Sequence, residues 1–388
     1  MPRRIGGTPQ LNCARLLCYN PATSGLEVVT SLARVAMATM TMRERMLAGL
    51  QGRPQDRVPF VQYSGTGGPN DEIWALLGRN RMGLLQWCGI HRVETPNCRF
   101  ESEDFERDGQ KMRRTTLHTP AGSLFEERAF ESAYGSSSIR RHYVQEPRDY
   151  DVLIAYLRDG LVLPDYEGYL KIDRELGDDG FALPAIERTP YQQLWVQWTG
   201  LMNLSFHLAE CPERVEEVIA LLNARARKIF EIAYRSPAAF IDFPDNITAP
   251  TIGPERFRRY CVPLYNELAG MLAERGAYVF VHMDGYLKPL WDEIGKSGVR
   301  GIDSLSPVPD NDTAVGQARK MWPEMRLWVN FPSSCHLRDY RGVRAVAEQI
   351  LEEDGRSGLL QIQISENVPK GAWRTSFPAI ADAIDVMA

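Results

Sequence analysis

The chain alternates short apolar segments with longer amphipathic ones from about residue 57 to its end. We expect strands at residues 57–63, 180–186, 238–248, 277–285, 299–305, 325–334 and 358–367. Helices are predicted between them, the longest at residues 211–236 and 253–276. Because parallel strands need long crossover connections, this alternation predicts parallel β/α units. Their number suits an α/β fold of the (β/α)8 TIM barrel type, and a doubly wound sheet is the alternative. No GxGxxG follows the first strand, so nothing favours a dinucleotide site.

Three segments lie outside the repeated units. Residues 41–52 read as a helix capped by Thr41, which gives the barrel an N-terminal helical extension. An insertion near residues 100–145 has two alternating segments around Pro120, the pattern of a β-hairpin. Residues 1–40 carry no acid before Glu27 and lack the strand–helix pattern. We interpret them as a disordered or mis-annotated leader, with a transit peptide as the alternative, and residues 41–388 as a single domain.

Composition narrows the class of protein. With 44% hydrophobic and 24% charged residues, the 388-residue chain can bury a sizeable core. A net charge of −5 and the lack of a basic run argue against nucleic acid as a partner. No apolar run approaches the roughly 18 residues of a membrane span. The seven cysteines are an odd number without a CxxC pair, which argues against a disulfide framework and predicts a cytoplasmic protein.

Polar side chains gather at the ends of the predicted strands. In (β/α)8 barrels the loops after these ends build the active site, so the side chains are candidates for one shared pocket. They are Tyr63, Asp242, Asp245, Asn246, His282, Asp284, Asp303, Asn330, Ser333, Glu366 and Asn367. As catalytic residues we single out Asp245, Tyr63 and Asn330. Asp245 could equally cap a turn, and Asp303 could hydrogen-bond a loop backbone.

The stretch "YVFVHMDGYL" places His282 and Asp284 two positions apart. Side chains two apart on a strand point to the same face, so both can reach one centre. An imidazole and a carboxylate are suitable ligands for zinc or another divalent ion, and Glu366 on the same rim is the third candidate. A hydrogen-bonded pair without metal is the alternative. Cys335, or His336 beside it, is a further possible ligand on the loop after another strand.

The order of several segments resembles the uroporphyrinogen decarboxylase superfamily, and more narrowly its cobamide-dependent methyltransferase branch. The segments are "TMRERMLAGLQGRPQDRVPF", "TPAGSL", "EPRDYDVL", "CPERVEEVIALL", "GPERFRRYCVPLYNELAGMLAERG", "VHMDG" and "SENVPKGAWR". The resemblance covers residues from about 41 to the end. It implies a (β/α)8 barrel that moves a methyl group between a small substrate and a corrinoid, either free or on a partner protein.

Two departures from the family refine this expectation. Where uroporphyrinogen decarboxylases carry an arginine-rich loop after the first strand, this chain reads "VQYSGTGGPND", so porphyrinogen decarboxylation is not expected. Thiol-methylating relatives bind zinc through His-x-Cys and a later cysteine, whereas the matching positions here are His282, Asp284 and Glu366. We therefore expect a metal-dependent methyltransferase acting on a methoxy aromatic, a methylamine or a thiol. The alternatives are a metal-free decarboxylase-like enzyme using Asp245 or Asp284, and a non-catalytic barrel that binds a corrinoid or another ligand.

Overall fold

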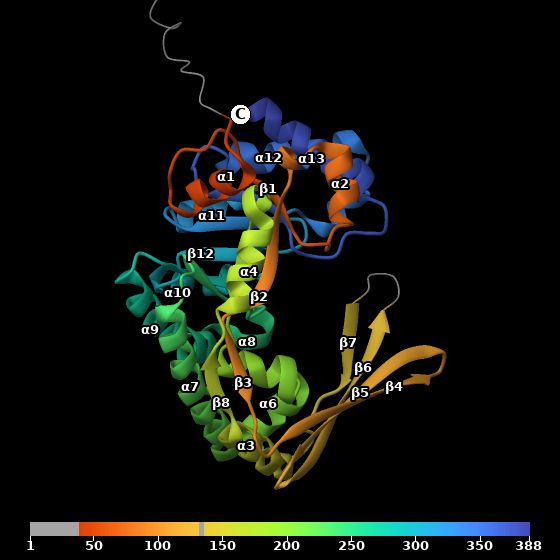
Figure 1. Cartoon of the computed structure of the whole chain (residues 1–388), viewed down its shortest axis with the longest axis vertical. Coiled ribbons are helices and arrows are strands. Elements are labelled where there is room, and N and C mark those ends of the chain that lie inside the picture. The colour runs from red at the N-terminus through yellow and green to blue at the C-terminus, as the bar shows by residue number, and fades with distance from the viewer. Residues whose placement is uncertain (1–38, 132–135) are drawn as a thin grey trace, which may run out of the picture. The chain divides into compact units, whose positions relative to one another are not determined.

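The computed structural model describes residues 39–131 and 136–388. Eight parallel strands close into a barrel in the order β1-β14-β13-β12-β11-β10-β9-β2. They are β1 (Phe60–Tyr63), β2 (Gly83–Gly89), β9 (Gly180–Ala185), β10 (Phe240–Phe243), β11 (Tyr278–His282), β12 (Gly301–Leu305), β13 (Arg326–Asn330) and β14 (Leu360–Ile364). Figure 1 shows helices around these strands. The predicted (β/α)8 barrel is confirmed.

The helices pack against the strands or against one another. They are α1 (Met42–Leu50), α2 (Asn70–Leu77), α3 (Tyr150–Asp159), α4 (Glu167–Leu176), α5 (Pro190–Gln193), α6 (Leu201–Glu210), α7 (Pro212–Arg235), α8 (Ala249–Arg256), α9 (Val262–Ala273), α10 (Trp291–Lys296), α11 (Val315–Met321), α12 (Tyr340–Asp354) and α13 (Trp373–Met387). In α7, residues Val215, Val218, Ile219 and Leu222 are buried. This spacing of three and four residues places them on one face of the helix. None of the helices in the described part of the chain is long and apolar enough to cross a membrane.

The N-terminal helix begins where its capping residues predict. The Thr41 hydroxyl accepts a hydrogen bond from the Glu44 amide, and the Glu44 carboxylate accepts one from the Thr41 amide, which forms a capping box. Arg45 is fully buried and pairs with Asp56, with 2.6 Å between Nε and Oδ1. The predicted leader, residues 1–40, lies outside the described residues except for positions 39 and 40.

One barrel strand was not predicted. Strand β2 lies between β1 and β9 and pairs with both, so the barrel cannot close without it. Its sequence, GLLQWCG, is buried over Gly83–Leu85 and partly exposed from Gln86 onwards. It contains neither a two-residue alternation nor a long apolar run, so periodicity could not reveal it.

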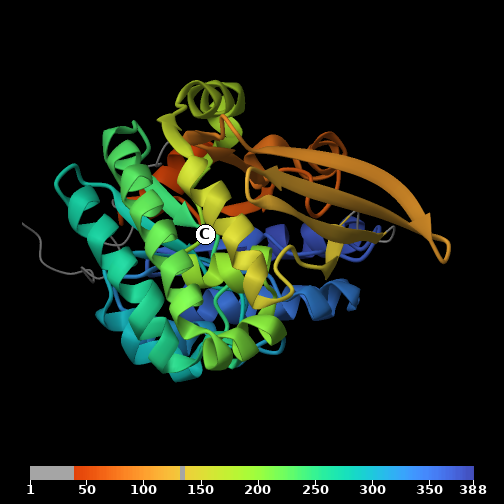
Figure 2. The same cartoon turned by 90° about the horizontal axis from the view of Figure 1, so that it is seen from below.

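The insertion is larger than the predicted hairpin. Strands β5 (Gln110–Thr119) and β6 (Gly122–Glu131) pair as expected. They belong to a four-stranded antiparallel sheet with β4 (Arg99–Arg107) and β7 (Ser136–Arg141). Figure 2 shows the long orange strands of this sheet running side by side away from the helices. A separate two-stranded sheet pairs β3 (His91–Glu94) with β8 (Leu161–Pro164).

The barrel interior contains two layers of different chemistry. The aromatic layer consists of Phe181, Phe240, Phe280 and Trp328. The polar layer lies nearer the carboxyl ends of the strands and consists of Tyr63, Asp242, His282, Asp303 and Gln363. The ring centroids of Phe280 and Trp328 lie 4.4 Å apart. A Cβ atom at Gly301 would lie 2.0 Å from the Phe280 ring, so a glycine is required there to make room for the aromatic layer.

Candidate metal centre

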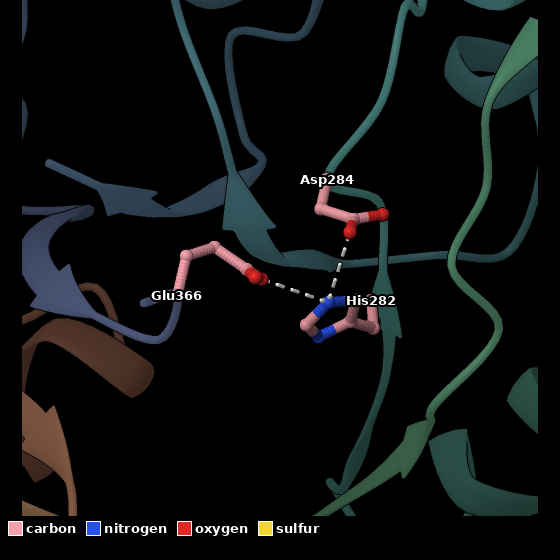
Figure 3. A group of neighbouring side chains, drawn as sticks. All are labelled: His282, Asp284 and Glu366. Atoms are coloured by element: carbon pink, nitrogen blue, oxygen red, sulfur yellow. Dashed lines mark ion pairs between the residues drawn. The ribbon is translucent and has the colours of Figure 1, made fainter. Parts of the chain in front are cut away.

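Three side chains from two distant strand ends converge at the barrel mouth. Nε2 of His282, at the end of β11, lies 3.7 Å from Oδ2 of Asp284 and 3.6 Å from Oε1 of Glu366, which follows β14. Figure 3 shows the two carboxylates pointing at the imidazole from different sides. Their ligand atoms all lie within 4.8 Å of one another. The three residues singled out as metal ligands are therefore brought together.

The spacing of these atoms suits a shared ion. Ligand atoms about 2.0–2.2 Å from a tetrahedral ion lie roughly 3.3–3.6 Å from one another. The two distances from Nε2 are close to this range and long for direct hydrogen bonds. One nitrogen and two carboxylate oxygens can hold a divalent ion with an open position, and this donor set is harder and richer in oxygen than the histidine- and cysteine-rich sets of catalytic zinc sites. The residues present thus fit a divalent ion.

The other ring nitrogen of His282 is held by Asp303. Nδ1 lies 3.1 Å from Oδ2 of Asp303, which neighbours it on β12. Asp303 also accepts hydrogen bonds from the Tyr63 hydroxyl and from Nε2 of Gln363, the latter at 2.8 Å. An acceptor at Nδ1 places the proton of a neutral imidazole there, which leaves the Nε2 lone pair facing Asp284 and Glu366.

The charges of the cluster follow from its burial and contacts. Burial alone would lower the pKa of His282, but the surrounding carboxylates of Asp284, Asp303 and Glu366 raise it well above its ordinary value. Burial would raise the pKa of Asp284, yet contact with His282 lowers it overall. In the absence of an ion, a protonated His282 between carboxylates satisfies the same geometry. A bound cation and a proton therefore compete for Nε2.

Asp284 is supported by a second pair of residues. Asn246 donates from Nδ2 to Oδ2 of Asp284 at 3.3 Å, and Nη2 of Arg188 donates to Oδ1 of Asn246 at 3.0 Å. Asn246 has a φ of 54°, a left-handed conformation that is uncommon outside glycine. Such backbone strain persists where surrounding contacts hold it in place, and here it aims the Asn246 amide at Asp284.

Asp242 is fully buried in β10, and neither of its carboxylate oxygens has a hydrogen-bond partner among the described residues. Burial, followed by the charge of Asp303, raises its pKa well above the ordinary value. Burial thus favours the neutral, protonated form of this carboxyl. A neutral carboxylic acid in the polar layer can donate or accept one hydrogen bond without adding charge.

Asp245 does not join the cluster. Its Oδ1 accepts a hydrogen bond from the Thr189 amide at 2.7 Å, and its Oδ2 accepts bonds from the hydroxyls of Thr189 and Tyr265. Burial raises the pKa of Asp245 despite these bonds. The contacts tie the loop after β10 to the start of α5, as a turn-capping residue does.

Asn330, Cys335 and His336 contribute no ligand atom to the cluster found among the described residues. Oδ1 of Asn330 accepts from the amides of Ser365 and Glu366 at 3.1 and 3.3 Å, so it positions the Glu366 backbone. Cys335 is buried in the short helix Ser333–Leu337 and is not among the converging donors. Nδ1 of His336 lies 2.9 Å from the Ser376 hydroxyl, and burial lowers the pKa of this histidine to about 4.

An open cleft of about 520 Å³ reaches Asp284 and Glu366. Polar side chains dominate its lining: Asp284, Ser306, Asp310, Asn311, Asn330, Ser333, Ser334, Leu337, Glu366, Asn367 and Pro369. Its size is in the range of small-molecule sites. Within the described ranges no lysine or arginine lines it, so a ligand in the cleft meets hydroxyls, amides and carboxylates.

Sequence reasoning missed four contributors. Gln363 and Gln361 alternate with apolar residues in "LLQIQIS", and this polar alternation within a predicted barrel strand could have indicated an inward polar face. Arg188 follows the predicted strand at residues 180–186, so it met the same strand-end criterion as the carboxylates. Trp87 lies on the unpredicted strand β2, and its ring centroid is 6.4 Å from that of His282.

Comparisons with known proteins found one matching family model and several similar solved structures. The family model described as uroporphyrinogen decarboxylase (URO-D) matches residues 198–359, a stretch that includes His282 and Asp284. A solved methyltransferase from Methanosarcina mazei shares 14% identity over 89% of this chain and 99% of its own, with a TM-score of 0.56. A B12-independent methionine synthase from Shewanella sp. W3-18-1 shares 12% identity over 66% of this chain and 71% of its own, with a TM-score of 0.37. No curated protein matches significantly.

The fold and the family match together indicate which class of protein this chain resembles. The predicted resemblance to the uroporphyrinogen decarboxylase superfamily is confirmed, with the sequence match lying in the part of the barrel from Trp198 to Leu359. At 14% identity, the Methanosarcina mazei structure supports the fold alone. The protein is thus a (β/α)8 barrel similar to uroporphyrinogen decarboxylases, with a His–Asp–Glu cluster at its mouth.

Proposed function

We propose that this protein is a metal-dependent methyltransferase that moves a methyl group between a small substrate and a corrinoid. The observation that carries the proposal is the convergence of His282, Asp284 and Glu366, with Nδ1 of His282 held by Asp303. The superfamily match gives further support, as does the similarity in fold to a methyltransferase from Methanosarcina mazei.

In this proposal His282, Asp284 and Glu366 hold the ion. A divalent ion supplies Lewis-acid chemistry, lowering the pKa of a coordinated thiol or making an oxygen a better leaving group. Asp303 fixes the tautomer of His282, and Tyr63 and Gln363 fix Asp303. Burial and the charge of Asp303 raise the pKa of Tyr63 well above its ordinary value, so its hydroxyl keeps its proton and donates. Asn330 holds the Glu366 backbone in place.

The small substrate would occupy the cleft beside Asp284 and Glu366. A cleft of about 520 Å³ accommodates a small molecule. The corrinoid would approach from outside, presented free or by a partner protein. Porphyrinogen decarboxylation is not favoured, because a substrate with many carboxylates needs several cations at short range and residues 61–70 contain none.

Metal content is the first test. Protein purified without chelator should contain about one divalent ion per chain, most simply zinc. We expect His282→Ala and Glu366→Gln to lose it. Two matched controls, His118→Ala on β5 and Glu352→Gln on α12, should retain it, since both side chains lie outside the cluster. Equal metal content in wild type and His282→Ala would rule out the assignment.

Corrinoid absorbance is the second test. Wild type is mixed with cob(I)alamin and methoxylated aromatics or methylamines, and separately with methylcobalamin and thiols. Conversion that both controls retain and that His282→Ala and Glu366→Gln lose would support methyl transfer. Release of carbon dioxide from uroporphyrinogen at an enzymatic rate would contradict it and favour the decarboxylase alternative.

A further inference from the structure

Arg188 lies on the loop after β9, two hydrogen bonds away from the candidate metal ligand Asp284. Its Nη2 donates to Asn246, and Asn246 donates to Asp284. Burial lowers the pKa of Arg188, and its interactions with Asp245, Asp284 and Asp242 raise it. Arg188 therefore shares the electrostatic environment of the barrel mouth.

The guanidinium of Arg188 has donors left over. Its Nε is buried without a hydrogen-bond partner in residues 39–131 and 136–388, and its one recorded side-chain hydrogen bond is made by Nη2. Burial lowers the pKa of Arg188, but an arginine side chain stays protonated in proteins. Buried polar groups are normally hydrogen-bonded, but the Nε atoms of Arg225 and Arg275 also lack a partner among the described residues. What distinguishes Arg188 from these two is its hydrogen bond to Asn246, which connects it to Asp284.

The nearby carboxylates are committed to other partners. Asp284 contacts His282 and Asn246, and Asp245 accepts bonds from Thr189 and Tyr265. Asp242 has no hydrogen-bond partner in the described part of the chain, so it does not bond to Arg188. No carboxylate in the described part of the chain forms an ion pair with Arg188. With an ion bound to Asp284 and Glu366, their negative charge would be offset further, which leaves the positive charge of Arg188 without a counter-charge.

We propose that Arg188 binds an anionic group of the substrate, so that the substrate is a methylated small molecule bearing a carboxylate. A guanidinium matches the planar carboxylate and can donate to both of its oxygens. The anion would extend beyond the lining of the cleft to the β9 side of the mouth, where Asn246 joins Arg188 to Asp284, while the methyl-bearing atom lies at the metal centre. This inference rests on the proposed function for the methyl-bearing atom, but the binding of the carboxylate does not depend on methyl transfer.

Ligand-observed NMR titration tests the proposal with two matched pairs of probes. The first pair is methoxyacetate and 2-methoxyethanol, and the second is 4-methoxybenzoate and 4-methoxybenzyl alcohol. Each is titrated into wild type, Arg188→Gln, Arg188→Lys and Arg275→Gln. Arg275 is the matched control: it is also partly buried with an unpartnered Nε among the described residues, but it precedes β11 at the opposite end of the barrel. Metal content is measured on every variant.

We expect wild type and Arg275→Gln to bind the carboxylate of at least one pair about 10-fold more tightly than its neutral partner. Arg188→Gln should lose that preference while its affinity for the neutral partner changes less than about twofold, and Arg188→Lys should retain part of it. Three results would overturn the proposal. The first is that wild type shows no carboxylate preference for either pair, and the second is that Arg188→Gln keeps the preference unchanged. The third is that Arg188→Gln loses its metal and loses affinity equally for the carboxylate and the neutral probe. The last would make Arg188 a positioning residue for Asp284.

The two proposals fail separately. If wild type binds no metal and transfers no methyl group, but prefers the carboxylate probe in a way that depends on Arg188, only the proposed function is wrong. If metal and methyl transfer are present without carboxylate preference, only the role of Arg188 falls.

Discussion

The same strands build the aromatic and the polar layer of the barrel interior, but burial stabilises the first layer and costs free energy in the second. Strand β11 gives Phe280 to one layer and His282 to the other, and β10 gives Phe240 and Asp242. The aromatic layer removes large apolar surfaces from water, which stabilises the fold. The polar layer buries carboxyls, an imidazole and amides, which costs free energy unless each is hydrogen-bonded. On β10 and β11, a residue that stabilises the fold thus lies two positions before a residue of the polar layer.

The largest expected effect is a loss of protein stability when a side chain of the aromatic layer is truncated. Phe280 is fully buried against Phe240 and Trp328. Phe280→Ala should lower the free energy of unfolding by about 3–5 kcal/mol, because a large cavity remains. Phe206→Ala, at an exposed position on α6, should change it by less than about 0.5 kcal/mol. Urea denaturation measures both, and a small loss at Phe280 would contradict the division into layers.

A change in the polar layer should affect metal affinity rather than folding. Asp303→Asn removes the carboxylate that holds Nδ1 of His282, so metal affinity should fall about 10- to 100-fold. Competition with a chromogenic chelator measures it. Asp292→Asn on α10, outside the barrel interior, is the control and should bind metal like wild type. Unchanged affinity in Asp303→Asn would mean that Asp303 does not orient the histidine.

A third prediction concerns pH and a histidine outside both layers. His336 is buried neutral with a pKa of about 4, below its ordinary value of 6.5. Between these two pKa values His336 binds a proton in the unfolded chain but not in the folded chain. The free energy of unfolding therefore decreases as pH falls below 6.5. The expected loss from this residue is about 2 kcal/mol at pH 5 relative to pH 7.

His336→Gln isolates this effect, since glutamine can keep a hydrogen bond to Ser376 without titrating. Urea denaturation at pH 7 and pH 5 should give a smaller pH dependence for His336→Gln than for wild type. Identical pH dependence would show that His336 does not resist protonation in the folded protein.

The smallest effect is expected at Asp242. Its pKa is raised in the folded state, so the folded chain holds a proton that the unfolded chain loses above about pH 4. Stability should therefore fall as pH rises above about 4, by at most roughly 1.4 kcal/mol per pH unit, until the folded carboxyl itself ionises. Asp242→Asn should remove that slope while keeping the fold. Parallel stability curves for wild type and Asp242→Asn across this range would mean that Asp242 is ionised when folded.

Much of the fold was readable from sequence because periodicity is a local property. Seven of the barrel strands were predicted from apolar runs with turn residues at their ends, whereas β2 lacks both a period and a long run. The His282–Asp284 pair followed from the two-residue alternation of a strand. Glu366 followed from its place after the last strand.

Local sequence was enough to specify the strand–helix alternation, the polar strand ends and the same-face pair of His282 and Asp284. Which strand ends meet was settled only by the packing of the whole chain. The register of β11 against β12 sets Asp303 beside Nδ1 of His282. Closure of the barrel carries Glu366 to Nε2, and the loops after β9 and β10 bring Arg188 and Asn246 to Asp284. These contacts join residues that are far apart in the sequence, and such pairings depend on long-range packing that no local pattern encodes.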